Sequence, residues 1–103
     1  MEPIRSIYES DPDMIEIVQE FAQELPSRAT SVEDLLREGE LAELQRLAHQ
    51  LKGAGGGYGF APITEVAASL EQALKEGADA MVVRDRAATL CETLRAVEVP
   101  KED

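Results

Sequence analysis

The residues of this chain that can do chemistry gather in one short stretch, LAHQLKGAGGGYG, at positions 47–59. The stretch holds the only histidine, His49, with Lys52 three positions later and five glycines behind the lysine. An imidazole is largely neutral at neutral pH, and its free ring nitrogen can attack an activated phosphorus to form a phosphoramidate. A nearby cation can offset the charge of the phosphoryl oxygens. The pattern therefore favours a phosphoryl-accepting histidine, with Lys52 as the phosphate-side cation and Arg46 as a second, weaker candidate.

The position of His49 on its helix follows from the apolar residues around it. Each residue of an α-helix turns by about 100°, so His49 lies about 160° from Leu51, the centre of the apolar stripe of residues 41–58. An outward-facing imidazole is therefore expected. The same geometry places five residues on the surface around it: Gln45, Arg46, Lys52, Gly53 and Gly56. Because two of these are glycines, another protein's surface can approach the ring closely, although a loop over 55–57 is an alternative explanation of the glycine run.

The elements that must position this stretch are helices. Apolar residues recur at helical spacing over 14–36, 41–58, 63–74 and 83–97, and no strand alternation occurs. Pro26 interrupts the first stripe, which predicts either one kinked helix or two helices that meet there. Asp11 and Pro12 are typical of the start of that helix, and the spacing of Ile4, Ile7 and Tyr8 predicts a further short one. We expect an all-α fold: an antiparallel up-down four-helix bundle with a short extra N-terminal helix, as a single domain over 1–103.

Composition excludes several classes of function. The formal net charge of −11 over 103 residues disfavours nucleic acid and anionic membrane surfaces. No apolar run is long enough to span a bilayer and the N-terminus lacks a signal core, so a cytoplasmic protein is expected. Cys91 is alone and is expected to be buried or half-buried and unreactive, and no metal site is expected. Four helical carboxylates are assigned to the solvent face: Glu40, Glu43, Glu65 and Glu71.

The stretch HQLKGAGGGYG resembles the signature of histidine-containing phosphotransfer (HPt) domains. That signature is His-x-Leu-Lys-Gly, then small residues, then Gly ten positions after the histidine, and it matches at His49, Leu51, Lys52, Gly53 and Gly59. FAQELPSR, at 21–28, and VAASLEQALKEG, at 66–77, also resemble helices of that family. Where this chain has Gly56 and Gly57 the family usually keeps helix-tolerant residues, so the sequence leaves open whether 55–57 stay helical or the helix frays or ends early there.

The resemblance implies that His49 accepts a phosphoryl group from the aspartate of a response-regulator receiver domain and passes it on. Lys52 would be the phosphate-side cation and Gly53 the clearance for docking, with a polar residue, Gln50 or Gln45, near the phosphate. The chain would be a carrier rather than an enzyme, with no cofactor of its own, because the receiver supplies Mg²⁺ and the catalytic groups. A receiver domain or a hybrid histidine kinase is the expected partner, and a monomer is the expected state.

Two other classes of function stay open. The chain can be an adaptor bundle that binds a receiver or kinase without carrying phosphate. It can also be an enzyme that uses His49 as a general base, but this ranks far behind because the sequence shows no second titratable group one turn away on that face. The initiator methionine and the short tail favour a complete small protein over a fragment of a hybrid sensor kinase.

Overall fold

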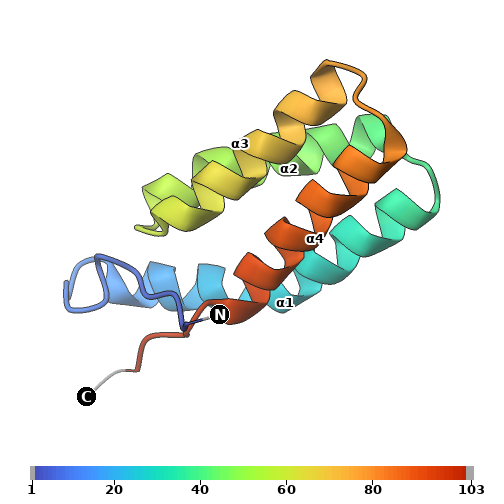
Figure 1. Cartoon of the computed structure of the whole chain (residues 1–103). Helices are drawn as coiled ribbons and strands as arrows, with labels where there is room; N and C mark the ends of the chain where they lie inside the picture. The colour runs from blue at the N-terminus through green and yellow to red at the C-terminus, as the bar shows by residue number, and fades with distance from the viewer. Residues whose placement is uncertain (1, 102–103) are drawn as a thin grey trace.

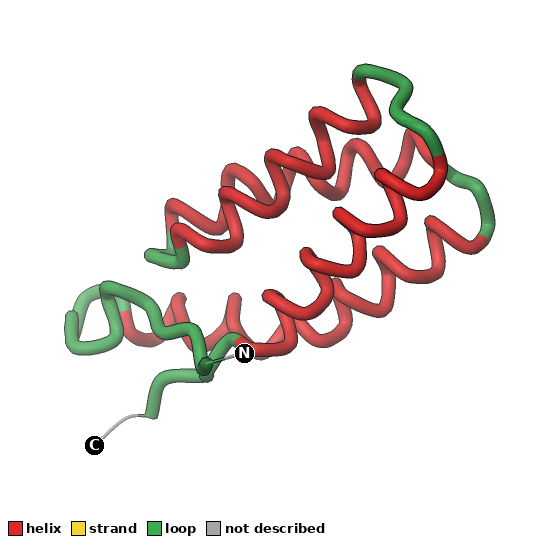
Figure 2. Tube along the Cα trace, viewed as in Figure 1, coloured by secondary structure: helices red, strands yellow, loops and turns green. Residues whose placement is uncertain are grey.

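The computed structural model describes residues 2–101, and four helices make up most of them. They are α1 (Ile15–Arg37), α2 (Leu41–Gly57), α3 (Ala61–Lys75) and α4 (Ala80–Ala96). α2 packs along α3 and α1 along α4, with short loops at the ends of the bundle (Figure 1). Figure 2 shows no strand over the described residues, where the one β-type contact is an isolated bridge between Ile4 and Val97. The expectation of an all-helical bundle is confirmed.

The core of the bundle is aliphatic, as expected for a chain with so few aromatic residues. Each helix buries the stripe that its 3.6-residue period predicts, and the largest fully buried side chain is Phe60, in the turn between α2 and α3. The other large, fully buried side chains come from all four helices: Val18, Leu25, Val32, Leu44, Ile63, Leu70, Leu90 and Leu94.

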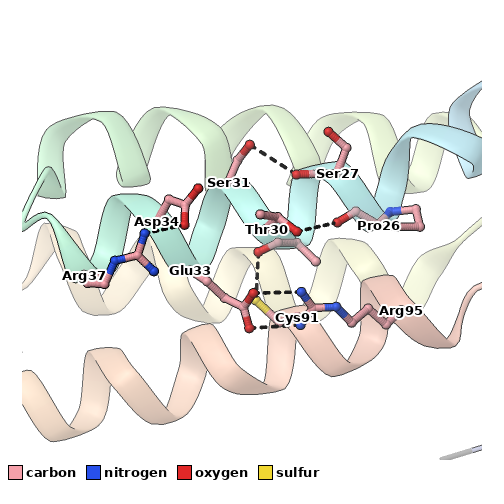
Figure 3. A network of polar contacts seen from close by, with 10 residues as sticks. Pro26, Ser27, Thr30, Ser31, Glu33, Asp34, Arg37, Cys91 and Arg95 are labelled. Carbon is pink, nitrogen blue, oxygen red and sulfur yellow. Dashed lines mark hydrogen bonds and ion pairs between the residues drawn. The ribbon is translucent and has the colours of Figure 1, made fainter.

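α1 runs through Pro26 as one helix, which decides between the two predictions made for that proline. Pro26 has no N–H to donate within the helix, and its ring lies on the exposed face of α1. One turn later the hydroxyl of Thr30 donates to the carbonyl of Pro26 at 3.3 Å, and Ser31 donates to the carbonyl of Ser27 at 3.2 Å (Figure 3). The helix begins at Ile15, three residues later than the Asp11–Pro12 pair indicates. Asp11 instead organises a preceding turn, where its carboxylate accepts from the backbone N–H of Asp13.

α1 and α4 are joined by polar contacts as well as apolar ones (Figure 3). Arg95 donates two hydrogen bonds to the carboxylate of Glu33, at 2.7 and 3.0 Å. The Cys91 thiol is buried and donates to the carbonyl of Ala29 at 3.4 Å. Burial raises the pKa of this thiol to about 11, so it stays protonated at neutral pH and is a poor nucleophile. The prediction of a buried cysteine is confirmed.

The extra N-terminal helix does not form, and this expectation is wrong. Ile4 pairs with the end of α4, and the hydroxyl of the buried Ser6 donates to the carbonyl of Tyr58 at 2.6 Å. The N–H of Ile7 donates to the carbonyl of Gly59 at 3.1 Å. So short a segment cannot stabilise a helix by itself, and its backbone groups find partners elsewhere in the bundle. The segment therefore runs from the end of α4 to the turn between α2 and α3.

The glycine run is helical, which decides against a loop over 55–57 and against an early end of the helix. α2 continues to Gly57, and the chain turns at Tyr58 and Gly59, whose φ of +84° favours glycine. Gly55 permits the close packing of α2 against α3, since a Cβ there would lie 2.9 Å from the Cβ of Ile63. The close approach of the α2 backbone to α3 replaces the side-chain contacts that a glycine cannot make.

Candidate functional site

His49 lies midway along α2 and points away from the core. Its side chain is 66 % exposed, whereas Leu51, two residues on, is buried. The orientation agrees with the helical geometry read from the sequence. Gly53, one turn after His49, leaves the expected access to the ring, because a Cβ built on Gly53 would meet nothing within 4 Å. The surface on this side of the ring is bare.

The imidazole has a partner that the sequence analysis missed. Its Nδ1 lies 2.7 Å from Oε2 of Glu71, a residue of α3 whose side chain is only 6 % exposed. The assignment of Glu71 to the solvent face is therefore wrong, while Glu40, Glu43 and Glu65 are exposed as expected. A signal was available: Glu71 follows Ala67 by four residues and precedes Leu74 by three, so it lies on the apolar side of α3.

Glu71 is a shared anion. Besides His49, it accepts from Lys52 Nζ through Oε1 at 2.5 Å, and Lys75 Nζ lies 3.6 Å from Oε2. The hydrogen bond from Lys52, helped by the one from His49 and by the charges of Lys52 and Lys75, outweighs burial and lowers the pKa of Glu71 to about 2. Glu71 is therefore a carboxylate at neutral pH.

The charge of Glu71 decides which nitrogen of His49 is free. An ionised carboxylate can only accept hydrogen bonds, so Nδ1 must carry the proton in this contact. In the neutral ring the other nitrogen, Nε2, then holds the lone pair. The arrangement fixes the tautomer and the direction of the ring, as a carboxylate does for a histidine in a catalytic triad or a metal site. Nε2 is the available nucleophile.

A shallow groove of about 410 Å³ lies beside the ring, between α2 and α3. Its lining brings together predicted and unpredicted residues: Ala42, Gln45, Arg46, His49, Glu71 and Lys75. Arg46 is exposed and forms an ion pair with Glu43 at 3.3 Å. A larger cavity of about 650 Å³, mainly between α1 and α4, shares no residue with this groove.

The remaining predicted site residues lie around the groove rather than in it. Lys52 is one turn beyond His49, and its carbonyl accepts from the hydroxyl of Thr64 at 2.7 Å, which ties α2 to α3 there. Gly56 faces the same threonine, since its Cβ would lie 3.4 Å from Thr64 Oγ1. Gln50 is exposed and does not line the groove.

The discovery of Glu71 also removes one argument against a general base, because a second titratable group does contact His49. The ring nevertheless stands at the edge of an open groove and is mostly exposed, so no enclosing pocket holds a substrate against it. Within residues 2–101, no group of three or more His, Cys, Asp or Glu side chains is placed to bind a metal ion. Over the same residues, no helix combines the length and the apolarity that crossing a bilayer requires.

Comparison with known proteins identifies the family. The family model described as Hpt domain matches residues 16–99, which include all four helices except the first residue of α1, together with His49, Glu71 and the groove. No curated protein and no solved structure matches the chain. The match covers most of the sequence and agrees with the resemblance carried by HQLKGAGGGYG. The chain belongs to the Hpt domain family, whose members carry phosphoryl groups in two-component signalling.

Proposed function

We propose that this chain is a single, antiparallel up-down Hpt bundle that works as a cytoplasmic phosphorelay carrier. It accepts a phosphoryl group on Nε2 of His49 from the aspartyl phosphate of a response-regulator receiver domain and passes it to another. The observation that carries this proposal is the exposed imidazole held through Nδ1 by the buried carboxylate of Glu71. Membership of the Hpt domain family supports the class of reaction.

The transfer step needs no general base on this chain, because the attacking nitrogen carries no proton. The lone pair of Nε2 attacks phosphorus, the N–P bond forms, and the P–O bond to the aspartate breaks with its electron pair leaving on the carboxylate oxygen. The imidazole keeps the proton on Nδ1, so positive charge develops on the ring. Glu71, 2.7 Å away, stabilises that charge, as the triad carboxylate stabilises an imidazolium. The return transfer is the reverse of this step.

The other residues of the site have supporting roles in this proposal. Lys52 holds Glu71 ionised and contributes positive charge near the phosphoryl group. Gly53 leaves room for the receiver surface, and Arg46 and Gln45 line the groove into which the acyl phosphate would enter. Gln50 lies outside the groove and has a lesser claim to a phosphate contact. Mg²⁺ and the catalytic groups belong to the receiver in this scheme.

A labelling experiment tests the proposal. A panel of receiver domains carrying a ³²P acyl phosphate is mixed with the wild-type chain and with a His49→Gln variant, and the label is followed by gel electrophoresis. We expect acid-labile, base-stable label on the wild type with at least one receiver, and none on the variant. A folded wild type that binds a receiver but takes label from none would instead support the adaptor function.

A further inference from the structure

Three cations surround Glu71 and His49, and they differ in how firmly they are held. Lys52 is bound to Glu71 at 2.5 Å and is 34 % exposed. Arg46 is paired with Glu43 on its own helix. Lys75, at the end of α3, is 50 % exposed and lies 3.6 Å from Glu71, which is too long for a hydrogen bond. Of the three cations, Lys75 is therefore the one without a hydrogen bond to a carboxylate.

Lys75 is also the one cation of α3, and it borders the groove beside the imidazole. It lines the groove with His49 and Arg46, whereas Lys52 does not. Lys75 and Nδ1 of His49 contact the same oxygen, Oε2 of Glu71, so one atom separates the ammonium from the ring. The lysine stem is long and flexible and its ammonium has three donors, so a change of rotamer can move it toward a group on the ring.

We infer that Lys75 is a second phosphate-binding cation: when Nε2 of His49 carries a phosphoryl group, the Lys75 ammonium leaves Glu71 and binds the phosphoryl oxygens. The inference rests on the proposed phosphorylation of His49. The exchange is favourable because a phosphoryl group carries more negative charge than the carboxylate and offers more acceptors. Glu71 does not become an unpaired buried charge, since Lys52 and the protonated Nδ1 remain bound to it.

The test measures the ionisation of the phosphoryl group itself. The purified chain is phosphorylated with phosphoramidate, which needs no receiver, and the ³¹P chemical shift of the phosphohistidine is followed between pH 6 and 9. A cation in contact with the oxygens lowers the pKa of the phosphoryl group. Lys75→Gln should therefore raise the titration midpoint by about 0.5 pH unit, a shift typical of a partly exposed ion pair.

Two control variants make the result specific. Lys101→Gln removes the same charge from the exposed C-terminal segment and should leave the midpoint at its wild-type value. Lys75→Arg keeps the charge at position 75 and should also have the wild-type midpoint. A midpoint for Lys75→Gln equal to that of Lys101→Gln, in a sample with wild-type helical content, overturns the role of Lys75 but not the relay. If the wild type shows no phosphohistidine signal while the phosphoramidate is consumed by free imidazole, both proposals fail.

Discussion

The imidazole of His49 on α2 is held through its Nδ1 by the buried carboxylate of Glu71 on α3, at 2.7 Å. The two residues are 22 positions apart, so the contact exists only because α2 and α3 pack closely. Gly55 allows that packing, and Thr64 bonds to the backbone of α2 one turn beyond the ring. The glycines near His49 therefore serve two purposes: Gly55 brings Glu71 within reach and Gly53 leaves the ring open.

This contact predicts which ring nitrogen of His49 takes the phosphoryl group in the proposed relay. Because Glu71 occupies Nδ1, we expect the phosphoryl group on Nε2. Long-range ¹H–¹⁵N spectra of the ring, recorded on the ¹⁵N-labelled chain after treatment with phosphoramidate, distinguish the two isomers. Phosphorylation of Nδ1 in the wild type would contradict the hydrogen-bond arrangement described above.

Glu71 should also set the rate of phosphorylation. Glu71→Gln keeps the size of the side chain but removes the charge that stabilises the positive ring, and we expect label uptake to fall by about tenfold or more, as for other carboxylates that orient a reacting histidine. The measurement is the rate of label uptake from phosphoramidate. Glu65→Gln is the matched control, since Glu65 is an exposed carboxylate on the same helix. Equal rates for the two variants would show that Glu71 does not assist the phosphorylation of His49.

The free energy of unfolding of the bundle should depend on pH through Glu71. The folded-state pKa of Glu71 is about 2, below its ordinary value of 4.5, so its contribution is present above pH 4.5 and is lost as the pH falls toward 2. Glu71→Gln lacks this contribution. Urea unfolding followed by circular dichroism gives the free energy of unfolding of both proteins. The difference between wild type and variant should be larger at pH 6 than at pH 2, by at most about 3 kcal/mol. A difference that does not change with pH would mean that Glu71 is not a specially stabilised anion.

Much of the fold can be predicted from the sequence because its elements are amphipathic helices. The 3.6-residue period alone identifies the four helices and places His49 opposite Leu51 on α2. The Hpt family assignment, which depends on residues 49–59, is confirmed by the match over 16–99. These features depend on residues that are close in sequence, where helical geometry is sufficient.

The missed features depend on contacts between distant residues. Periodicity gives the face on which Glu71 lies but not the three partners, Lys52, His49 and Lys75, that make its burial favourable, so a carboxylate there is expected in solvent. The spacing of Ile4 and Ile7 predicts a helix, whereas hydrogen bonds to the end of α4 and to Gly59 stabilise a non-helical segment with a turn over 7–10. Local preference is outweighed by tertiary structure in both cases.

The glycines of α2 should respond oppositely to the same substitution. Gly53→Ala adds a methyl group in open space and should stabilise the helix by up to about 1 kcal/mol. Gly55→Ala would place its Cβ 2.9 Å from that of Ile63 and 3.0 Å from the backbone nitrogen of Thr64, and should destabilise by about 1–3 kcal/mol. Urea unfolding at pH 7 measures both. A stabilised Gly55→Ala would show that α2 and α3 can separate without cost.

A larger residue at position 53 should separate docking from chemistry. Gly53→Leu puts a bulky side chain one turn beyond His49, where, among residues 2–101, no side chain or backbone from outside its own turn of α2 lies within 4 Å of the Cβ, so the bundle should fold normally. In the proposed docking a receiver domain approaches the ring over this surface, whereas phosphoramidate is small enough to reach Nε2 beside the leucine. We therefore expect label uptake from a charged receiver to fall by roughly tenfold or more, the effect of about 1.4 kcal/mol lost from the encounter, while uptake from phosphoramidate stays within about twofold of the wild type. Loss of both activities would mean that the leucine disturbs His49 itself, and loss of neither would place the receiver on another side of the ring.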